Sequence, residues 1–202
     1  MRTAAAGFRV HSGWCAMVAL TLEDGRPEIL FRGRLQLVEI FDYQFRQPYH
    51  TAVEMDGTKR RDFISQIRKT AENLASREVR RVQAELADRK IRLRTCGMLA
   101  SSARPLPRLE KILASHPLLH TADGELFRDA LMAAARRCKL SVLPVKEKEV
   151  MSEAAKAIGL TPAALRKRAK DLGRGLGAPW TQDQQYAALA AWIALSNRRK
   201  PR

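Results

Sequence analysis

The sequence predicts an α/β domain in which helices flank a mixed five-stranded sheet, with three antiparallel strands followed by two parallel ones. Three observations support this prediction. Short apolar runs joined by turn residues fill positions 8–41, an amphipathic helical pattern covers 59–89, and helical and strand patterns then alternate up to residue 195. Strands joined by tight turns pair antiparallel, whereas strands separated by helices can pair in parallel.

The first three strands are expected within residues 8–22, 28–32 and 35–41. The first alternates apolar and polar residues at its start, which is typical of a strand with one buried face. Asp24-Gly25, followed by Pro27, predicts the turn into the second strand, because glycine adopts positive φ freely. Residues 1–6 are expected to be a short disordered tail.

A loop is expected over residues 43–56, then a long helix over 59–89 and a fourth strand over 91–99. The apolar positions of the helix recur at steps of three to five residues and form one stripe: Phe63, Ile67, Ala71, Leu74, Val79, Val82 and Leu86. Such a stripe fits packing onto the core of the same chain, and it fits a homodimer equally well.

The remaining elements are a short helix from Pro105 to about Ser115, a helix over 122–138, a fifth strand over 140–145, a basic helical segment over 152–173 and an alanine-rich helix over 182–195. Residues 1–196 are therefore expected to form one domain, and residues 197–202 a basic disordered tail.

The charge of the chain favours a polyanionic partner. The formal net charge is +16 and the sequence pI is about 10.6, which favours nucleic acid first and an anionic membrane second. A basic surface that only keeps the protein soluble remains an alternative. The three cysteines lack CxxC spacing, which argues against a disulfide framework or a zinc site and fits a reducing cytoplasm. No apolar run approaches the ~18 residues of a membrane span, so we expect no membrane association.

Several segments carry a resemblance to a known family. Residues 7–14 (GFRVHSGW), 123–136, 140–145 (LSVLPV) and 182–190 (QDQQYAALA) follow one another in a familiar order. In this order the chain resembles the ribonuclease-H-like superfamily and is closest in layout to RuvC-type resolvases. The resemblance implies an α/β ribonuclease-H-like fold. It also implies a nuclease site in which carboxylates bind two divalent metal ions beside the scissile phosphate.

The expected carboxylates are mostly missing. The first strand offers Ala5 or Ala6 where the family has an aspartate, and residues 95–98 (TCGM) contain no glutamate. The last helix keeps Asp183, but the second acidic position is Tyr186. The sequence therefore predicts a nuclease site that is degenerate or altered.

A rearranged catalytic site is predicted from Glu125 and Asp183, with His11 or Glu54 as an additional group and with Mg²⁺ or Mn²⁺ as cofactor if the protein is a nuclease. As an alternative, Asp183 caps its helix, and Asp123 and Glu125 are ordinary first-turn acids. The histidines His11, His50 and His120 are not spaced HxxxH or HxH from one another, so no metal ligands are assigned to them.

Candidate nucleic-acid-binding residues are the basic run Arg166, Lys167, Arg168, Lys170 and Arg174, together with Arg46 and Tyr49. The basic run lies in a segment, 152–173, that resembles a helix-turn-helix, although a plain helical hairpin explains it equally well. For Tyr49, packing against the long helix is the alternative.

These observations predict a protein that binds DNA or RNA through a RuvC-like domain with a degenerate nuclease site. Two alternatives remain. One is a metal-dependent nuclease with a rearranged carboxylate site, and the other is a non-catalytic subunit that binds a protein partner.

Overall fold

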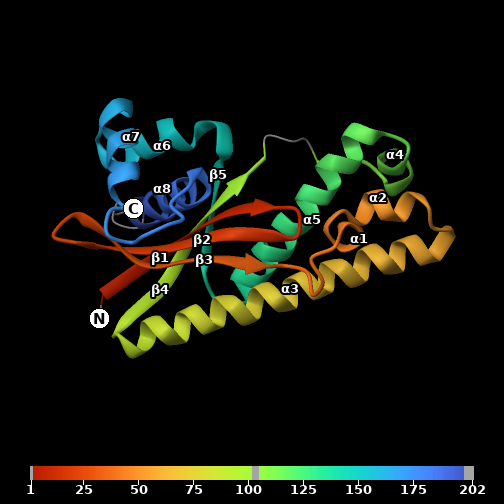
Figure 1. Ribbon diagram of the computed structural model, residues 1–202, viewed down its shortest axis with the longest axis horizontal. Helices are drawn as coiled ribbons and strands as arrows, with labels where there is room; N and C mark the ends of the chain where they lie inside the picture. Colours follow the sequence, from red (N-terminus) through yellow and green to blue (C-terminus); the bar gives the residue numbers. More distant parts are fainter. Residues whose placement is uncertain (1, 102–104, 198–202) are drawn as a thin grey trace.

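The computed structural model describes residues 2–101 and 105–197. Five strands form one sheet in the order β3-β2-β1-β4-β5 (Figure 1). β1 pairs antiparallel with β2, and β2 with β3, whereas β1, β4 and β5 run parallel. The predicted mixed sheet, with three antiparallel strands followed by two parallel ones, is confirmed.

The strands are β1 (Arg2–His11), β2 (Trp14–Glu23), β3 (Arg26–Gln36), β4 (Ile91–Ala100) and β5 (Ser141–Lys146). The helices are α1 (Tyr43–Arg46), α2 (Pro48–Val53), α3 (Gly57–Asp88), α4 (Leu109–Leu113), α5 (His116–Arg137), the 3-10 turn η1 (Glu147–Glu149), α6 (Val150–Ile158), α7 (Pro162–Asp171) and α8 (Gln182–Asn197).

The first predicted boundary is wrong. Residues 2–6 are not a disordered tail but the beginning of β1, in which Ala4, Ala5 and Ala6 have no exposed surface. β1 is the central strand, so small side chains on both of its faces are covered by helices. An alanine run has little intrinsic strand preference, and tertiary packing decides its conformation.

Five other boundaries differ. The strand expected within residues 8–22 is two strands, the end of β1 and most of β2, which are joined by a turn that contains Gly13. β3 is one strand through Gly33 rather than two strands around it, and residues 37–41 lie outside the sheet. The short helix expected from Pro105 is α4, which begins at Leu109. The expected loop over 43–56 contains the short helices α1 and α2. The helix expected from residue 122 begins at His116, where Pro117 occupies its first turn. Of the predicted basic tail, Asn197 ends α8 and residues 198–202 lie outside the described chain.

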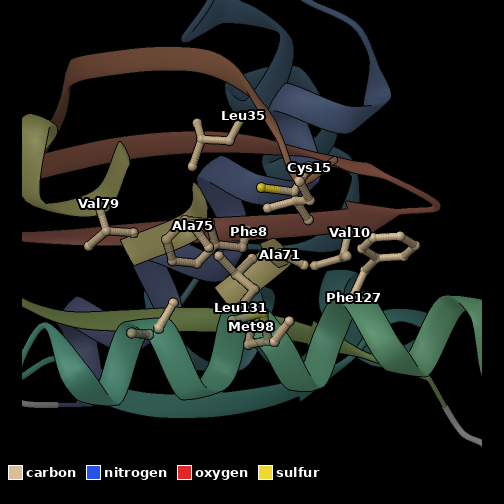
Figure 2. Packing of buried hydrophobic residues seen from close by; sticks show 14 of the residues in the cluster. Phe8, Val10, Cys15, Leu35, Ala71, Ala75, Val79, Met98, Phe127 and Leu131 are labelled. Atoms are coloured by element: carbon tan, nitrogen blue, oxygen red, sulfur yellow. The ribbon is translucent and has the colours of Figure 1, made fainter. Parts of the chain in front are cut away.

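The two faces of the sheet have separate cores. On one face, α3 and α5 cover the side chains of Phe8, Cys15 and Met98 (Figure 2). On the other face, α8 covers Ala5 and Val18, and α6 and α7 pack outside it. Most of the stripe of α3 is buried against α5 and the sheet, with Phe63 and Leu74 partly buried, so core packing accounts for it without a second protomer.

Within the described residues, no helix is long and apolar enough to cross a membrane. Cys15, Cys96 and Cys138 are free thiols and all are buried.

Candidate functional site

Two glycines fix the position of α8 on the sheet. A Cβ atom added to Gly7 of β1 would lie 1.7 Å from the carbonyl oxygen of Ala187, and one added to Gly97 of β4 would lie 2.1 Å from that of Ala190. Gly7 and Gly97 are register partners, so the backbone of α8 rests directly on two adjacent central strands. Side chains at these positions would push α8 away and move its N-terminus.

The N-terminus of α8 is fixed by Thr181. The backbone amide of Asp183 donates to Thr181 Oγ1 over 3.3 Å, while the backbone amide and hydroxyl of Thr181 both donate to Gln184 Oε1. This reciprocal pattern is a capping box. Thr181 therefore supplies the side-chain cap, and the carboxylate of Asp183 is free to bind other groups.

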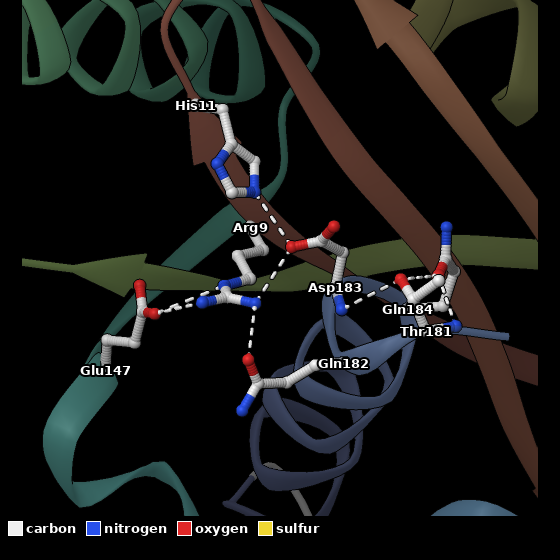
Figure 3. Close-up of polar contacts among 7 residues, drawn as sticks. All are labelled: Arg9, His11, Glu147, Thr181, Gln182, Asp183 and Gln184. Atoms are coloured by element: carbon white, nitrogen blue, oxygen red, sulfur yellow. Dashed lines mark hydrogen bonds and ion pairs between the residues drawn. The ribbon is translucent and has the colours of Figure 1, made fainter.

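That carboxylate meets two side chains of β1 (Figure 3). The Nη1 of Arg9 donates to Asp183 Oδ1 over 2.8 Å, and the Nε2 of His11 lies 2.8 Å from the same oxygen. The other side of the Arg9 guanidinium donates to Glu147 Oε1 through Nε at 3.1 Å and Nη2 at 2.7 Å. Arg9 thus bridges a carboxylate at the end of β5 and another in the first turn of α8.

Partial burial makes this bridge stronger than a surface ion pair. The side chain of Arg9 is 16% exposed, that of Asp183 23% and that of Glu147 34%. Water screens partly buried charges less than exposed ones, and a guanidinium bonded on two sides loses little freedom per hydrogen bond. The guanidinium carbon of Arg9 also lies 5.1 Å from the centroid of the Tyr186 ring, within the range of a cation–π contact.

A row of rings and guanidinium groups leads away from this cluster. The His11 ring stacks on Trp14 at 4.3 Å, and the guanidinium of Arg34 lies 4.3 Å from the centroid of the Trp14 ring. Arg34 also lies 4.7 Å from the centroid of Phe41, and Arg46 lies 4.3 Å from the same ring. We call these five side chains the stacked row. Phe41 is 41% exposed, so part of this row is open to solvent.

The structure brings together only part of the predicted catalytic set. His11 and Asp183 are in contact, but Glu125 bonds instead to Ser101 and to Arg128, the latter at 2.8 Å. Glu54 is exposed at the end of α2. Because α5 begins at His116, Asp123 and Glu125 are not in its first turn, and the expectation that they interact with the helix N-terminus is wrong.

The residues at the expected family positions also differ from the prediction. Ala5 and Ala6 are buried in the core, and the β1 side chains that reach Asp183 are Arg9 and His11. Glu147 was not among the site residues predicted from the sequence. A signal for it was present, because Glu147 directly follows a strand that runs parallel to β4 and β1, and the carboxyl ends of parallel strands meet at one edge of a sheet.

The predicted basic run forms an exposed helix face. Arg166, Lys167, Arg168 and Lys170 are exposed on α7, which follows α6 after the turn at Gly159. Among the described residues, these four cations have no carboxylate within ion-pair distance, whereas Arg174 pairs with Asp171 at 3.0 Å. α6 and α7 do form a helical pair, as both the helix-turn-helix and the hairpin interpretations require.

Two surface hollows connect this helix to the cluster. One is lined by Arg166 and Lys170 of α7, the other by Arg9 and Lys148, and both are lined by Gln182 and Tyr186. The basic face of α7 and the Arg9–Asp183 cluster therefore each border a hollow at the start of α8, and Gln182 and Tyr186 line both hollows.

The two residues of the segment around residue 46 that were predicted to bind nucleic acid lie in different surroundings. Arg46 belongs to the stacked row, but Tyr49 is only 5% exposed and burial raises the pKa of its hydroxyl. A ring enclosed in this way cannot stack on a base, so the stacking role predicted for Tyr49 is wrong and its packing role is the correct one.

No protein-family model and no curated protein matches the sequence. Solved structures do match. RuvC of T. thermophilus in complex with a Holliday junction substrate has a TM-score of 0.56 at 12% identity, over 98% of this chain and 95% of that chain. A second Thermus thermophilus RuvC structure has a TM-score of 0.51 at 12% identity, over 97% and 95%. The chain therefore has a RuvC-like, ribonuclease-H-like fold.

Proposed function

We propose that this protein binds nucleic acid through its RuvC-like domain and does not cleave it by a two-metal mechanism. The observation that carries the proposal is the Arg9 guanidinium, which holds Asp183 at 2.8 Å and Glu147 at 2.7 Å. The permanently charged guanidinium of Arg9 therefore lies between the two carboxylates that the fold brings together.

The donor set at this place does not fit a pair of divalent cations. A two-metal site uses several carboxylates to hold ions about 3.5–4 Å apart. Here two carboxylates converge, and one oxygen of each is already bonded to Arg9. A metal ion would have to displace a guanidinium that cannot lose its proton. We therefore assign a structural role to Asp183 and Glu147. Both bind Arg9, and through it they connect the ends of β1 and β5 to the start of α8.

Three features support a nucleic-acid partner. The net charge of +16 attracts polyanions, and the exposed cations of α7 include Arg166 and Lys170, which line a hollow at the start of α8. One of the similar solved structures contains a Holliday junction substrate. On this proposal, Arg166, Lys167, Arg168, Lys170 and Arg174 bind backbone phosphates, and Arg46 with the exposed edge of Phe41 contacts unpaired or splayed bases.

The partner is DNA or RNA, and the proposed location is the cytoplasm, where three unpaired thiols stay reduced. Binding through phosphates predicts little sequence preference and a steep dependence on salt.

Fluorescence anisotropy tests the binding part of the proposal. Labelled four-way-junction DNA, duplex DNA, single-stranded DNA and RNA are titrated with the full chain at about 50 and about 200 mM salt. We expect binding that weakens by at least about tenfold over this range, because several counterions are released per complex. Absence of binding to every substrate at the lower salt concentration would contradict the proposal and favour a protein partner instead.

A further inference from the structure

A cluster of three histidines lies apart from the Arg9–Asp183 cluster. His50 belongs to α2, and His116 and His120 stand one turn apart at the start of α5. One ring nitrogen of each lies within 4.8 Å of those of the others. In Figure 1, α2 lies beside the N-terminal half of α5, past the ends of the strands and at the opposite side of the view from α6, α7 and α8.

The buried histidine of this cluster is held in one orientation. The Nδ1 of His50 lies 2.6 Å from Oδ2 of Asp123, whose other oxygen accepts a hydrogen bond from the backbone amide of Tyr49 at 2.7 Å. Asp123 is almost completely buried, and the side chain of His50 is 10% exposed. A carboxylate that binds one ring nitrogen fixes the tautomer, so that the lone pair of the opposite nitrogen is available.

That opposite nitrogen lacks a partner. The Nε2 of His50 is buried and, among the described residues, has no hydrogen-bond acceptor or donor. Buried polar atoms are nearly always satisfied, so an unpartnered nitrogen beside two further imidazoles points to a ligand at this place. The His50 ring lies 4.5 Å from the ring of His120 and 5.3 Å from that of His116, measured between centroids.

The exposed pair has the spacing of two ligands of one metal ion. The Nε2 atoms of His116 and His120 are 3.1 Å apart. Two nitrogens bound to tetrahedral zinc, each at about 2.0–2.1 Å, are about 3.3 Å apart by geometry. The i, i+4 spacing places both rings on one face of α5, next to His50.

We propose that His50, His116 and His120 bind one divalent transition-metal ion, with Zn²⁺ as the best match to three imidazole ligands. Asp123 is the positioning residue for His50, and the fourth coordination position is open to water or to a further ligand. Imidazole favours Zn²⁺, Cu²⁺ and Ni²⁺ over Mg²⁺, so this site differs in chemistry from a nuclease metal pair. The ion would join α2 to the start of α5 and so fix the segment that carries Arg46.

Half of this signal is visible in the sequence. No two of His11, His50 and His120 have ligand spacing, whereas His116 and His120 do, and this pair was not among the predicted site residues. The third ligand comes from another helix, so only the fold could add it.

Metal binding by the full chain tests the proposal directly. After treatment with a chelator and removal of the chelator, the protein is titrated with Zn²⁺ and with Co²⁺, and bound metal is measured by elemental analysis and by the visible absorption of Co²⁺. We expect one ion per chain, an absorption spectrum typical of nitrogen ligands, and a rise in Tm with added Zn²⁺.

Two variants and one control identify the ligands. The double variant His116→Ala/His120→Ala removes two exposed side chains, so it should keep its circular dichroism spectrum and lose the ion. Asp123→Asn should bind about 10–100-fold more weakly, because the orientation and basicity of His50 change. His11→Ala removes the one histidine outside the cluster and should still bind one ion. No stoichiometric uptake by the wild type, or equal uptake by the double variant, would overturn the proposal.

Discussion

Oδ1 of Asp183 is shared by Nη1 of Arg9 and Nε2 of His11, each at 2.8 Å. Both partners extend from β1 and Asp183 stands in the first turn of α8, so a single carboxylate oxygen ties the central strand to the last helix. The position of this helix is set independently by the close contact of its backbone with Gly7 and Gly97.

Exchanging Arg9 for an acid should create a cation site. In Arg9→Asp, a third carboxylate joins Asp183 and Glu147, and the guanidinium that neutralised them is gone. Without metal, we expect this variant to be less stable than the wild type, because three carboxylates then repel one another. Added Mn²⁺ should raise its Tm, because the bound ion neutralises this repulsion in the folded state. Thermal unfolding followed by circular dichroism, with and without Mn²⁺, measures both effects.

Arg9→Asn is the matched control, since it has the size of the aspartate without its charge. It should lose about 1–3 kcal/mol of unfolding free energy, the cost of leaving charged groups without their partner, and should respond to Mn²⁺ less than Arg9→Asp does. Equal stabilisation of the wild type and of Arg9→Asp by Mn²⁺ would contradict the role assigned to Arg9.

Gly7→Ala should be strongly destabilising. The new methyl group would overlap the carbonyl oxygen of Ala187, which belongs to the helix backbone and cannot rotate away. We expect a loss of about 3 kcal/mol or more, measured by urea denaturation. In the control Gly124→Ala, the nearest atom is the flexible end of Arg128 at 3.3 Å, and a gain of up to about 1 kcal/mol from helix propensity is expected. Similar effects for both variants would mean that α8 does not rest on Gly7 as described.

Removing cations from α7 should lower the salt dependence of nucleic-acid binding. Arg166→Ala/Lys167→Ala takes away two exposed charges, and the slope of log K against log salt concentration should fall by about 2 if both contact phosphates. Anisotropy titrations at several salt concentrations give this slope.

Arg61→Ala/Lys69→Ala on α3 is the control for that experiment. It removes the same residue types from an exposed face of a helix on the opposite side of the sheet. A slope that falls equally in both double variants would show that net charge, rather than the α7 face, determines binding.

The three thiols should be inert in the folded protein. Burial raises the pKa of Cys96 to about 12 and also raises those of Cys15 and Cys138, so little thiolate forms at mildly alkaline pH. Ellman's reagent should label none of the three in the native state on the timescale on which it labels all three in guanidinium chloride. Rapid labelling of one thiol in the native protein would contradict the packing of the element that carries it.

The sequence was most informative about the long elements. The apolar stripe of α3 and the alternation in β4 gave the correct element types, because burial on one face leaves a clear period. Ala4–Ala6 had no period to detect, since a central strand is covered on both faces. α1 and α2 are too short for a helical pattern to distinguish them from a loop.

Site residues could be predicted only where they lie in segments whose order along the chain resembles that of a known family. Asp183 and His11 were found in this way, and the structure places them in contact. Arg9 was not predicted because the family resemblance implies an acid, not a cation, in β1. Glu147 was not predicted because its approach to Arg9 depends on the parallel register of β5 with β4. The hydrogen bond between Ser101, which directly follows β4, and Glu125 of α5 likewise could not be predicted, because it depends on how close these two elements lie in space.

A cleavage assay with a labelled four-way DNA junction, Mn²⁺ and the wild-type protein, run beside Asp183→Asn, shows directly whether the chain cuts nucleic acid. We expect the wild type to bind the junction and leave every strand intact, as the variant does. Cleavage by the wild type that requires Mn²⁺ and disappears in Asp183→Asn would rule out the role assigned to Arg9 and establish a metal-dependent nuclease.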